Sequence, residues 1–124
     1  MKRLALTIVF VLGFASPVWA DFSDGIAAYD RGDYAGALKE WRPLAEQGNA
    51  GAQYNLGVMY DNGQGVPQDY VKAHMWYNLS AAGSPPSEDR DSAAENRDIV
   101  AELMTREQIV EALRLARDWT PKTQ

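Results

Sequence analysis

Apolar residues recur at helical spacing through most of the chain that follows residue 20. In residues 34–47 they stand at i, i+1, i+4, i+7 and i+8, which places them on one face of an α-helix. Patterns of this kind predict helices over about residues 23–31, 34–47, 50–62, 69–82, 88–104 and 106–118. The sequence therefore indicates an all-α protein.

Short polar residues stand where several of these helices are expected to begin. Asp33 precedes the second helix and Ser87 the fifth, each in the position of an N-cap. Thr105 and Gln108 have the spacing of a capping box at the start of the last helix. Gly57, inside the third helix, is expected to let a neighbouring backbone come close.

Two segments of the chain repeat the same order of residues. The run Asp33, Tyr34, Ala37 and Ala45 recurs 36 positions later as Asp69, Tyr70, Ala73 and Ala81. Two copies in a short chain predict a small solenoid of stacked helix pairs. The downstream copy carries five extra residues, 64–68, in the loop between its helices, and Val66 in this loop is expected to pack into the core.

Residues 50–83 resemble the Sel-1-like repeat family, a relative of the tetratricopeptide repeat. The resemblance is carried by Leu56-Gly57, Tyr60, Gly63, Gly65-Val66, Asp69, Lys72-Ala73, Trp76 and Ala81-Ala82-Gly83. Residues 21–48 read as a degenerate copy that lacks the loop insertion. The resemblance implies a short right-handed α-α superhelix of antiparallel helix pairs that acts as an adaptor or scaffold for other proteins, without chemistry of its own.

The segment after the second repeat is expected to close the stack. Residues 87–119 read as a C-terminal capping helix pair with charged outer faces, because a terminal repeat must stay soluble. The stripe Ile109, Ala112, Leu113 and Ala116 would face inward. The polar tail from Thr120 onward is expected to fray.

Residues 1–20 read as a secretory signal peptide, with Lys2 and Arg3 before an apolar run over residues 4–15. Val18 and Ala20 occupy the small-residue positions that a signal peptidase reads, which predicts a cut before Asp21. A permanent anchor is the competing reading, but a membrane-spanning helix needs about 20 apolar residues and this run is shorter. We therefore expect an exported protein, periplasmic or secreted in a bacterium, with no stable membrane anchor after cleavage.

The chain is acidic and contains no cysteine, with a net charge of −5. Removal of residues 1–20 leaves ten basic and 17 acidic residues, a net charge of −7. A surface of this sign is repelled by phosphate backbones and anionic lipids, which argues against nucleic-acid and membrane partners. A basic or neutral protein or peptide partner is expected. Without cysteine, no disulfide braces the fold.

The sequence predicts no catalytic residue, metal or cofactor. His74 is the single histidine and has no ligand partner at i±4 on its helix, and Ser80 falls on the opposite face of that helix. The acidic residues of 88–98 lack the spacing of a calcium loop. The loop 63–68 lacks the Lys-Ser/Thr ending of a phosphate-binding loop.

Partner-binding residues follow from the resemblance, which implies that the first helices of successive repeats line a concave groove. In this register the groove positions are Tyr54, Val58, Asp61 and Asn62 downstream, and Ala27 and Asp30 upstream. An aromatic side chain supplies contact area and acidic neighbours attract a basic or aromatic-bearing peptide.

The leading hypothesis is thus a non-catalytic exported adaptor that binds a protein or peptide. The alternative is a cell-wall enzyme that hydrolyses β-lactams or peptidoglycan, because a few exported relatives have been described in that way. A third hypothesis is a stabilising subunit of an envelope complex.

Overall fold

The computed structural model of the chain describes residues 20–85 and 87–123. This part of the chain forms six α-helices and no strand, as the apolar pattern predicts. The helices are α1 (Phe22–Asp30), α2 (Tyr34–Glu46), α3 (Ala50–Asn62), α4 (Tyr70–Gly83), α5 (Glu88–Ala101) and α6 (Arg106–Asp118). α5 ends before the predicted residue 104, because residues 102–104 close into a turn. The predicted signal peptide lies outside the described residues, except for Ala20.

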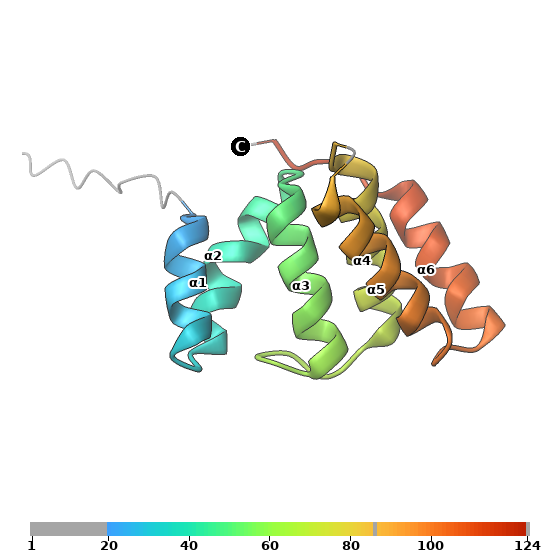
Figure 1. Cartoon of the computed structure of the whole chain (residues 1–124), viewed down its shortest axis with the longest axis horizontal. Coiled ribbons are helices and arrows are strands. Elements are labelled where there is room, and N and C mark those ends of the chain that lie inside the picture. Colours follow the sequence, from blue (N-terminus) through green and yellow to red (C-terminus); the bar gives the residue numbers. More distant parts are fainter. Residues whose placement is uncertain (1–19, 86, 124) are drawn as a thin grey trace, which may run out of the picture.

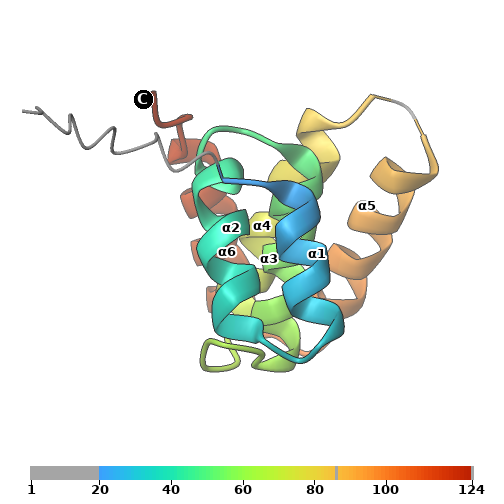
Figure 2. The ribbon, with the colours of Figure 1, turned by 90° about the vertical axis from the view of Figure 1, so that its left-hand side faces the viewer.

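The helices stack in chain order (Figure 1). α1 packs on α2, α2 on α3 and α3 on α4, and α4 then contacts both α5 and α6. Seen from the end of the stack, α1 and α5 lie on one side and α2 and α6 on the other (Figure 2). The arrangement is that of a short helical-repeat solenoid, with α4 as the helix that has most neighbours.

Each of the six described helices begins at a short polar N-cap whose side chain accepts a backbone N–H. The predicted caps are confirmed, and Thr105 and Gln108 form both hydrogen bonds of the capping box. The full set is Asp21, Asp33, Asn49, Asp69, Ser87 and Thr105. Local sequence therefore determines where these helices start.

The helices cross at small residues. Six alanines, at least one from every helix but α1, have no exposed surface: Ala37, Ala45, Ala52, Ala73, Ala93 and Ala112. A side chain this small lets two helix axes come close, and aromatic rings then fill the space beside each crossing. Val66 in the loop between α3 and α4 packs against the same core, as predicted.

Gly57 lies at a tight contact between α3 and α4. A Cβ atom added at Gly57 would lie 2.6 Å from ring carbons of Tyr77, so the close neighbour is a ring and not the backbone that we expected. Tyr77 is 1% exposed, and its hydroxyl donates to the Asp61 carboxylate at 3.2 Å. That bond matters because a buried hydroxyl without a partner costs about 1–3 kcal/mol.

The C-terminal pair differs in part from expectation. Most of its charged residues are exposed as predicted, with Glu111 partly buried, but Ile99, Leu103, Val110 and Leu113 are also 47–61% exposed. Leu113 was expected on the inner stripe. Ala112, on the same predicted stripe, is buried as expected, whereas Leu113 is turned by about 100° around the helix from it and lies outside the core.

The tail after α6 does not fray. Lys122 donates its backbone N–H to the carbonyl of Glu46 at 2.7 Å, and its ammonium lies 3.3 Å from the Glu46 carboxylate. Figure 1 shows the tail running back from α6 toward the end of α2. Lys122 is therefore tied to the end of α2.

Replacing Gly57 with alanine should lower the free energy of unfolding by about 1–3 kcal/mol, because the new methyl group overlaps the buried Tyr77 ring. Gly83→Ala is the matched control, since its Cβ would meet no atom closer than 3.9 Å, and it should change stability by less than about 0.5 kcal/mol. Urea denaturation measures both. Equal effects of the two substitutions would contradict the role assigned to the Tyr77 contact.

Candidate functional site

Two adjoining cavities lie along the side of α3 that faces α1 and α5. One, of about 460 Å³, is bounded by α3, the end of α4 and the start of α5. The other, of about 340 Å³, lies between α1 and α3 over Trp41 of α2. Phe22, Tyr54 and Asn55 line both cavities. We call the two cavities together the α3 groove.

The end of the α3 groove beside α1 is aromatic. Phe22, Tyr29 and Trp41 line it, with Ile26 and Val58 beside them. The Trp41 indole N–H donates to the Phe22 carbonyl at 3.1 Å, and the Trp41 ring centroid lies 5.7 Å from that of Tyr29. These contacts hold the rings in place before any ligand binds.

Tyr54 forms the wall between the two cavities and is fixed from two sides. Its hydroxyl accepts a hydrogen bond from the Asn96 amide of α5 at 3.0 Å, and its ring centroid lies 5.7 Å from that of Tyr77. The Tyr54 side chain therefore connects α3 to both α4 and α5.

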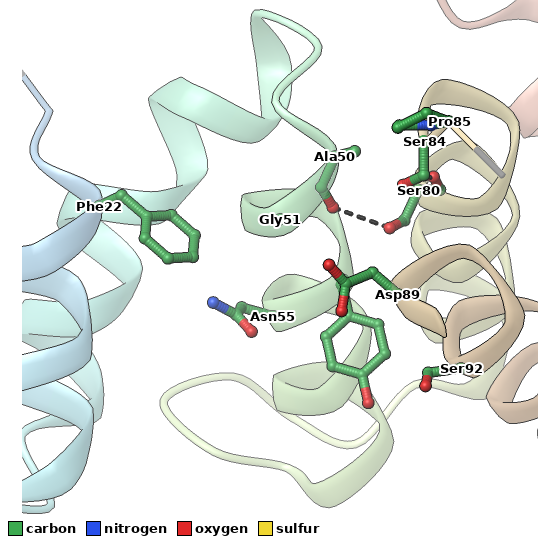
Figure 3. A pocket seen from close by; sticks show the side chains of 10 residues that line it. Phe22, Ala50, Gly51, Asn55, Ser80, Ser84, Pro85, Asp89 and Ser92 are labelled. Carbon is green, nitrogen blue, oxygen red and sulfur yellow. Dashed lines mark hydrogen bonds between the residues drawn. The ribbon is translucent and has the colours of Figure 1, made fainter. Parts of the chain in front are cut away.

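The end of the α3 groove beside α5 carries more polar side chains than the end beside α1 (Figure 3). The Ser80 hydroxyl donates to the Ala50 carbonyl, and the Ser84 hydroxyl donates to the Ser80 carbonyl, each at 2.8 Å. Both hydroxyls are thus engaged with the backbone. Asp89, in the first turn of α5, is the one charged residue among those that line either cavity.

The structure brings together only part of the predicted site. Tyr54 and Val58 line the α3 groove. Asp61 lies one turn further along α3, where its carboxylate accepts the Tyr77 hydroxyl. Asn62 and Asp30 are exposed at the ends of α3 and α1, and neither lines the two cavities. Ala27 faces a different hollow, between α1 and α2.

Sequence reasoning missed the contributions of α1 and α5 to the groove. Phe22, Ile26 and Tyr29 stand at i, i+4 and i+7 on α1, a stripe that was visible in the sequence. Counting groove positions from Tyr29 with the spacing used for α3 selected Ala27 and Asp30 instead. Asp89 and Ser92 gave no comparable signal, because their position depends on how α5 packs against α4.

His74 lies apart from the groove, on α4, and is 4% exposed. Its Nδ1 atom has no hydrogen-bond partner among the residues that the structure describes. Burial lowers the pKa of His74 below its ordinary value, and the Arg97 guanidinium lowers it further, while Asp98 opposes the change. The folded protein therefore favours the neutral form of His74 down to a lower pH than the unfolded chain does.

Within 20–85 and 87–123, no three His, Cys, Asp or Glu side chains are grouped so that they could hold a metal ion. None of the helices in these ranges is long and apolar enough to cross a membrane.

Burial, and to a smaller extent the Asp61 carboxylate, raise the pKa of the Tyr77 hydroxyl well above its usual range. The hydroxyl therefore remains a protonated hydrogen-bond donor.

Residues 50–84 match the Sel1 repeat family. The match spans α3, the loop and α4, which are the elements behind the resemblance seen in the sequence. The Sel1 match therefore includes the central wall of the α3 groove.

Three curated proteins are similar over part of the chain. The exopolysaccharide production negative regulator of Rhizobium leguminosarum bv. viciae is 37% identical over 70 residues, which are 55% of this chain and 26% of the regulator. DAP3-binding cell death enhancer 1 of Rattus norvegicus and that of Mus musculus are each 40% identical over 42 residues, 34% of this chain and 8% of theirs. The chain thus spans about a quarter of the first relative and less than a tenth of the others. No solved structure matches it.

Stability should fall as the pH is lowered from about 6.5, the ordinary histidine pKa, toward the lower pKa of folded His74. In this range the unfolded chain binds a proton that the folded chain does not, so protonation favours unfolding. His74 is the single histidine, so His74→Gln should reduce the difference in unfolding free energy between pH 7 and pH 5. Denaturant titrations at both pH values measure it, and an unchanged difference would show that another group is responsible.

Proposed function

We propose that the chain is a non-catalytic exported adaptor that binds a protein or peptide partner in the α3 groove. The observation that carries this proposal is the groove itself, with fixed aromatic walls on one side of a helical-repeat stack. Sel1 repeats mediate contacts between proteins, and one protein that is similar to part of this chain is named for binding another protein. A groove of this size fits side chains of a bound segment.

The hydroxyls in the groove support a binding role over catalysis. A serine nucleophile needs a base within hydrogen-bond reach. Ser80 and Ser84 instead donate to backbone carbonyls of α3 and α4, contacts that hold the helix ends together. His74, the single histidine, does not line either cavity. We therefore favour the adaptor over the hydrolase.

The charge of the protein supports a basic or neutral partner. The net charge of the chain is −5, and no Lys or Arg is among the described residues that line the α3 groove. Such a surface attracts cationic segments and repels nucleic acid and anionic lipid.

The start of α1 is compatible with export and cleavage before Asp21. The Asp21 carboxylate caps α1 by accepting the backbone N–H groups of Ser23 and Asp24. A cut before Asp21 would keep this cap. It would also convert the Asp21 backbone N–H, which donates to the Glu40 carboxylate at 2.9 Å, into a terminal ammonium that faces the same carboxylate.

Asn55→Arg should block partner binding, because Asn55 lines both cavities and an arginine there would fill the groove and repel a cationic segment. Gln47→Arg is the matched control: it makes the same change of charge at an exposed position that lines neither cavity. The measurement is affinity capture from envelope extract with the tagged chain and both variants. We expect one partner protein that the native chain and Gln47→Arg retain and Asn55→Arg loses.

Three results would count against the proposal. Equal retention by Asn55→Arg and Gln47→Arg would place binding outside the α3 groove. If no protein is retained and the purified chain turns over nitrocefin or muropeptides, the hydrolase becomes the better account. A partner whose loss makes this chain unstable in the cell would favour a subunit of an envelope complex.

The full chain, expressed in a bacterium with a C-terminal tag, should appear in the periplasm or medium with Asp21 as its first residue. The caps and contacts of α1 remain complete in that product. N-terminal sequencing of the purified protein makes the measurement. Retention of Met1 on a membrane-bound product would contradict export with cleavage.

A further inference from the structure

The aromatic end of the α3 groove leaves one large aliphatic side chain without cover. Ile26 is 42% exposed at the edge of a cavity whose walls are mainly rings, including those of Phe22 and Trp41. The rings are held by contacts with each other, so the cavity is present without a ligand. A preformed apolar cavity of about 340 Å³ is suited to a large apolar side chain, which would cover Ile26 on entry.

The other end of the groove favours a cation. Asp89 lines the larger cavity. Arg90 and Arg97, the basic residues of α5, lie beside Asp91 and Asp98 instead. Within the described part of the chain Asp89 has no ion-pair partner, and no basic residue lines the cavity to oppose an incoming cation.

Asn55 connects the two ends. It lines both cavities, and its side-chain amide offers a donor and an acceptor. A peptide backbone presents the complementary groups, N–H and C=O. An extended segment is therefore better suited to the groove than two separate small ligands.

We propose that the α3 groove recognises an extended protein segment by one large apolar side chain, bound against Ile26 and the rings, and one Lys or Arg side chain, bound at Asp89. This inference rests on the proposed adaptor function and adds the chemistry of the partner. The aromatic end supplies most of the affinity because it removes apolar surface from water. Asp89, which is exposed, chiefly selects the sign of the charge.

The test uses random peptides displayed on phage and selected on the immobilised protein. The selected peptides should share a large apolar residue and a Lys or Arg. A synthetic peptide of the selected sequence is then titrated by calorimetry against the native protein and against two pairs of variants. Each pair consists of one groove residue and a control of similar exposure or position.

Ile26→Ser is paired with Leu113→Ser, because the two side chains are 42% and 47% exposed and only Ile26 lines the groove. Ile26→Ser should weaken binding about tenfold, because the complex would no longer bury part of this aliphatic side chain. Leu113→Ser should leave the affinity unchanged.

Asp89→Asn is paired with Asp91→Asn, because both carboxylates are exposed in the first turn of α5 and only Asp89 lines the groove. Asp89→Asn should weaken binding about threefold, because it removes one exposed ion pair with the peptide, and Asp91→Asn should leave the affinity unchanged. Replacing the peptide's basic residue with Met should remove the difference between native protein and Asp89→Asn.

The outcomes separate this inference from the function on which it rests. Selected peptides that lack a basic residue, or that bind Asp89→Asn as tightly as native protein, overturn the inference; the proposed groove stands if Asn55→Arg still abolishes their binding. Peptides that bind Asn55→Arg and Ile26→Ser undiminished overturn both. Binding lost only in Leu113→Ser would assign recognition to the exposed aliphatic residues of α5 and α6, and selection of no peptide would also overturn the inference.

Discussion

The contact between the Tyr77 ring and Gly57 sets how closely α3 and α4 approach, and the other helices are positioned from this pair. No side chain at residue 57 separates the helices, so the ring lies against the α3 backbone. The buried hydroxyl would oppose this arrangement if it had no partner, at a cost of about 1–3 kcal/mol. The Asp61 carboxylate, one turn along α3, accepts a hydrogen bond from this hydroxyl. Asp61 therefore has a structural role on α3 in addition to any effect on the surface charge.

The consequences of this contact reach the α3 groove. Tyr54 packs beside Tyr77 and accepts a hydrogen bond from Asn96, so that α3, α4 and α5 share one connected set of side chains. On the other side, Trp41 bonds to the Phe22 carbonyl and joins α1 to α2. A groove between helices held in this way does not have to become ordered on binding, which lowers the entropic cost of association. Its selectivity then depends on the few side chains that face the opening.

More of the fold than of the candidate site could be predicted from the sequence, and the reason is physical. The caps at Asp33, Ser87 and Thr105 were predictable because each depends on residues within one turn of the helix start. The placement of Tyr54 and Val58 was predictable from their position on α3. Asp89 was not, because its place in the groove depends on how α5 packs against α4, and the pattern within one helix does not determine that packing. The folded-back tail was missed for the same reason, since Lys122 bonds to a residue of α2.

The sequence by itself determined the six helices and their caps, because hydrophobic periodicity and capping act over a few residues. Only the tertiary structure decided which side chains meet across helices: that Asp61 is engaged by Tyr77, that Asp30 and Asn62 lie outside the groove, and that Phe22 and Asp89 line it. Those contacts follow from the rotation and separation of packed helices. Small residues such as Gly57 set that rotation and separation, which cannot be predicted from the spacing of apolar residues within one helix.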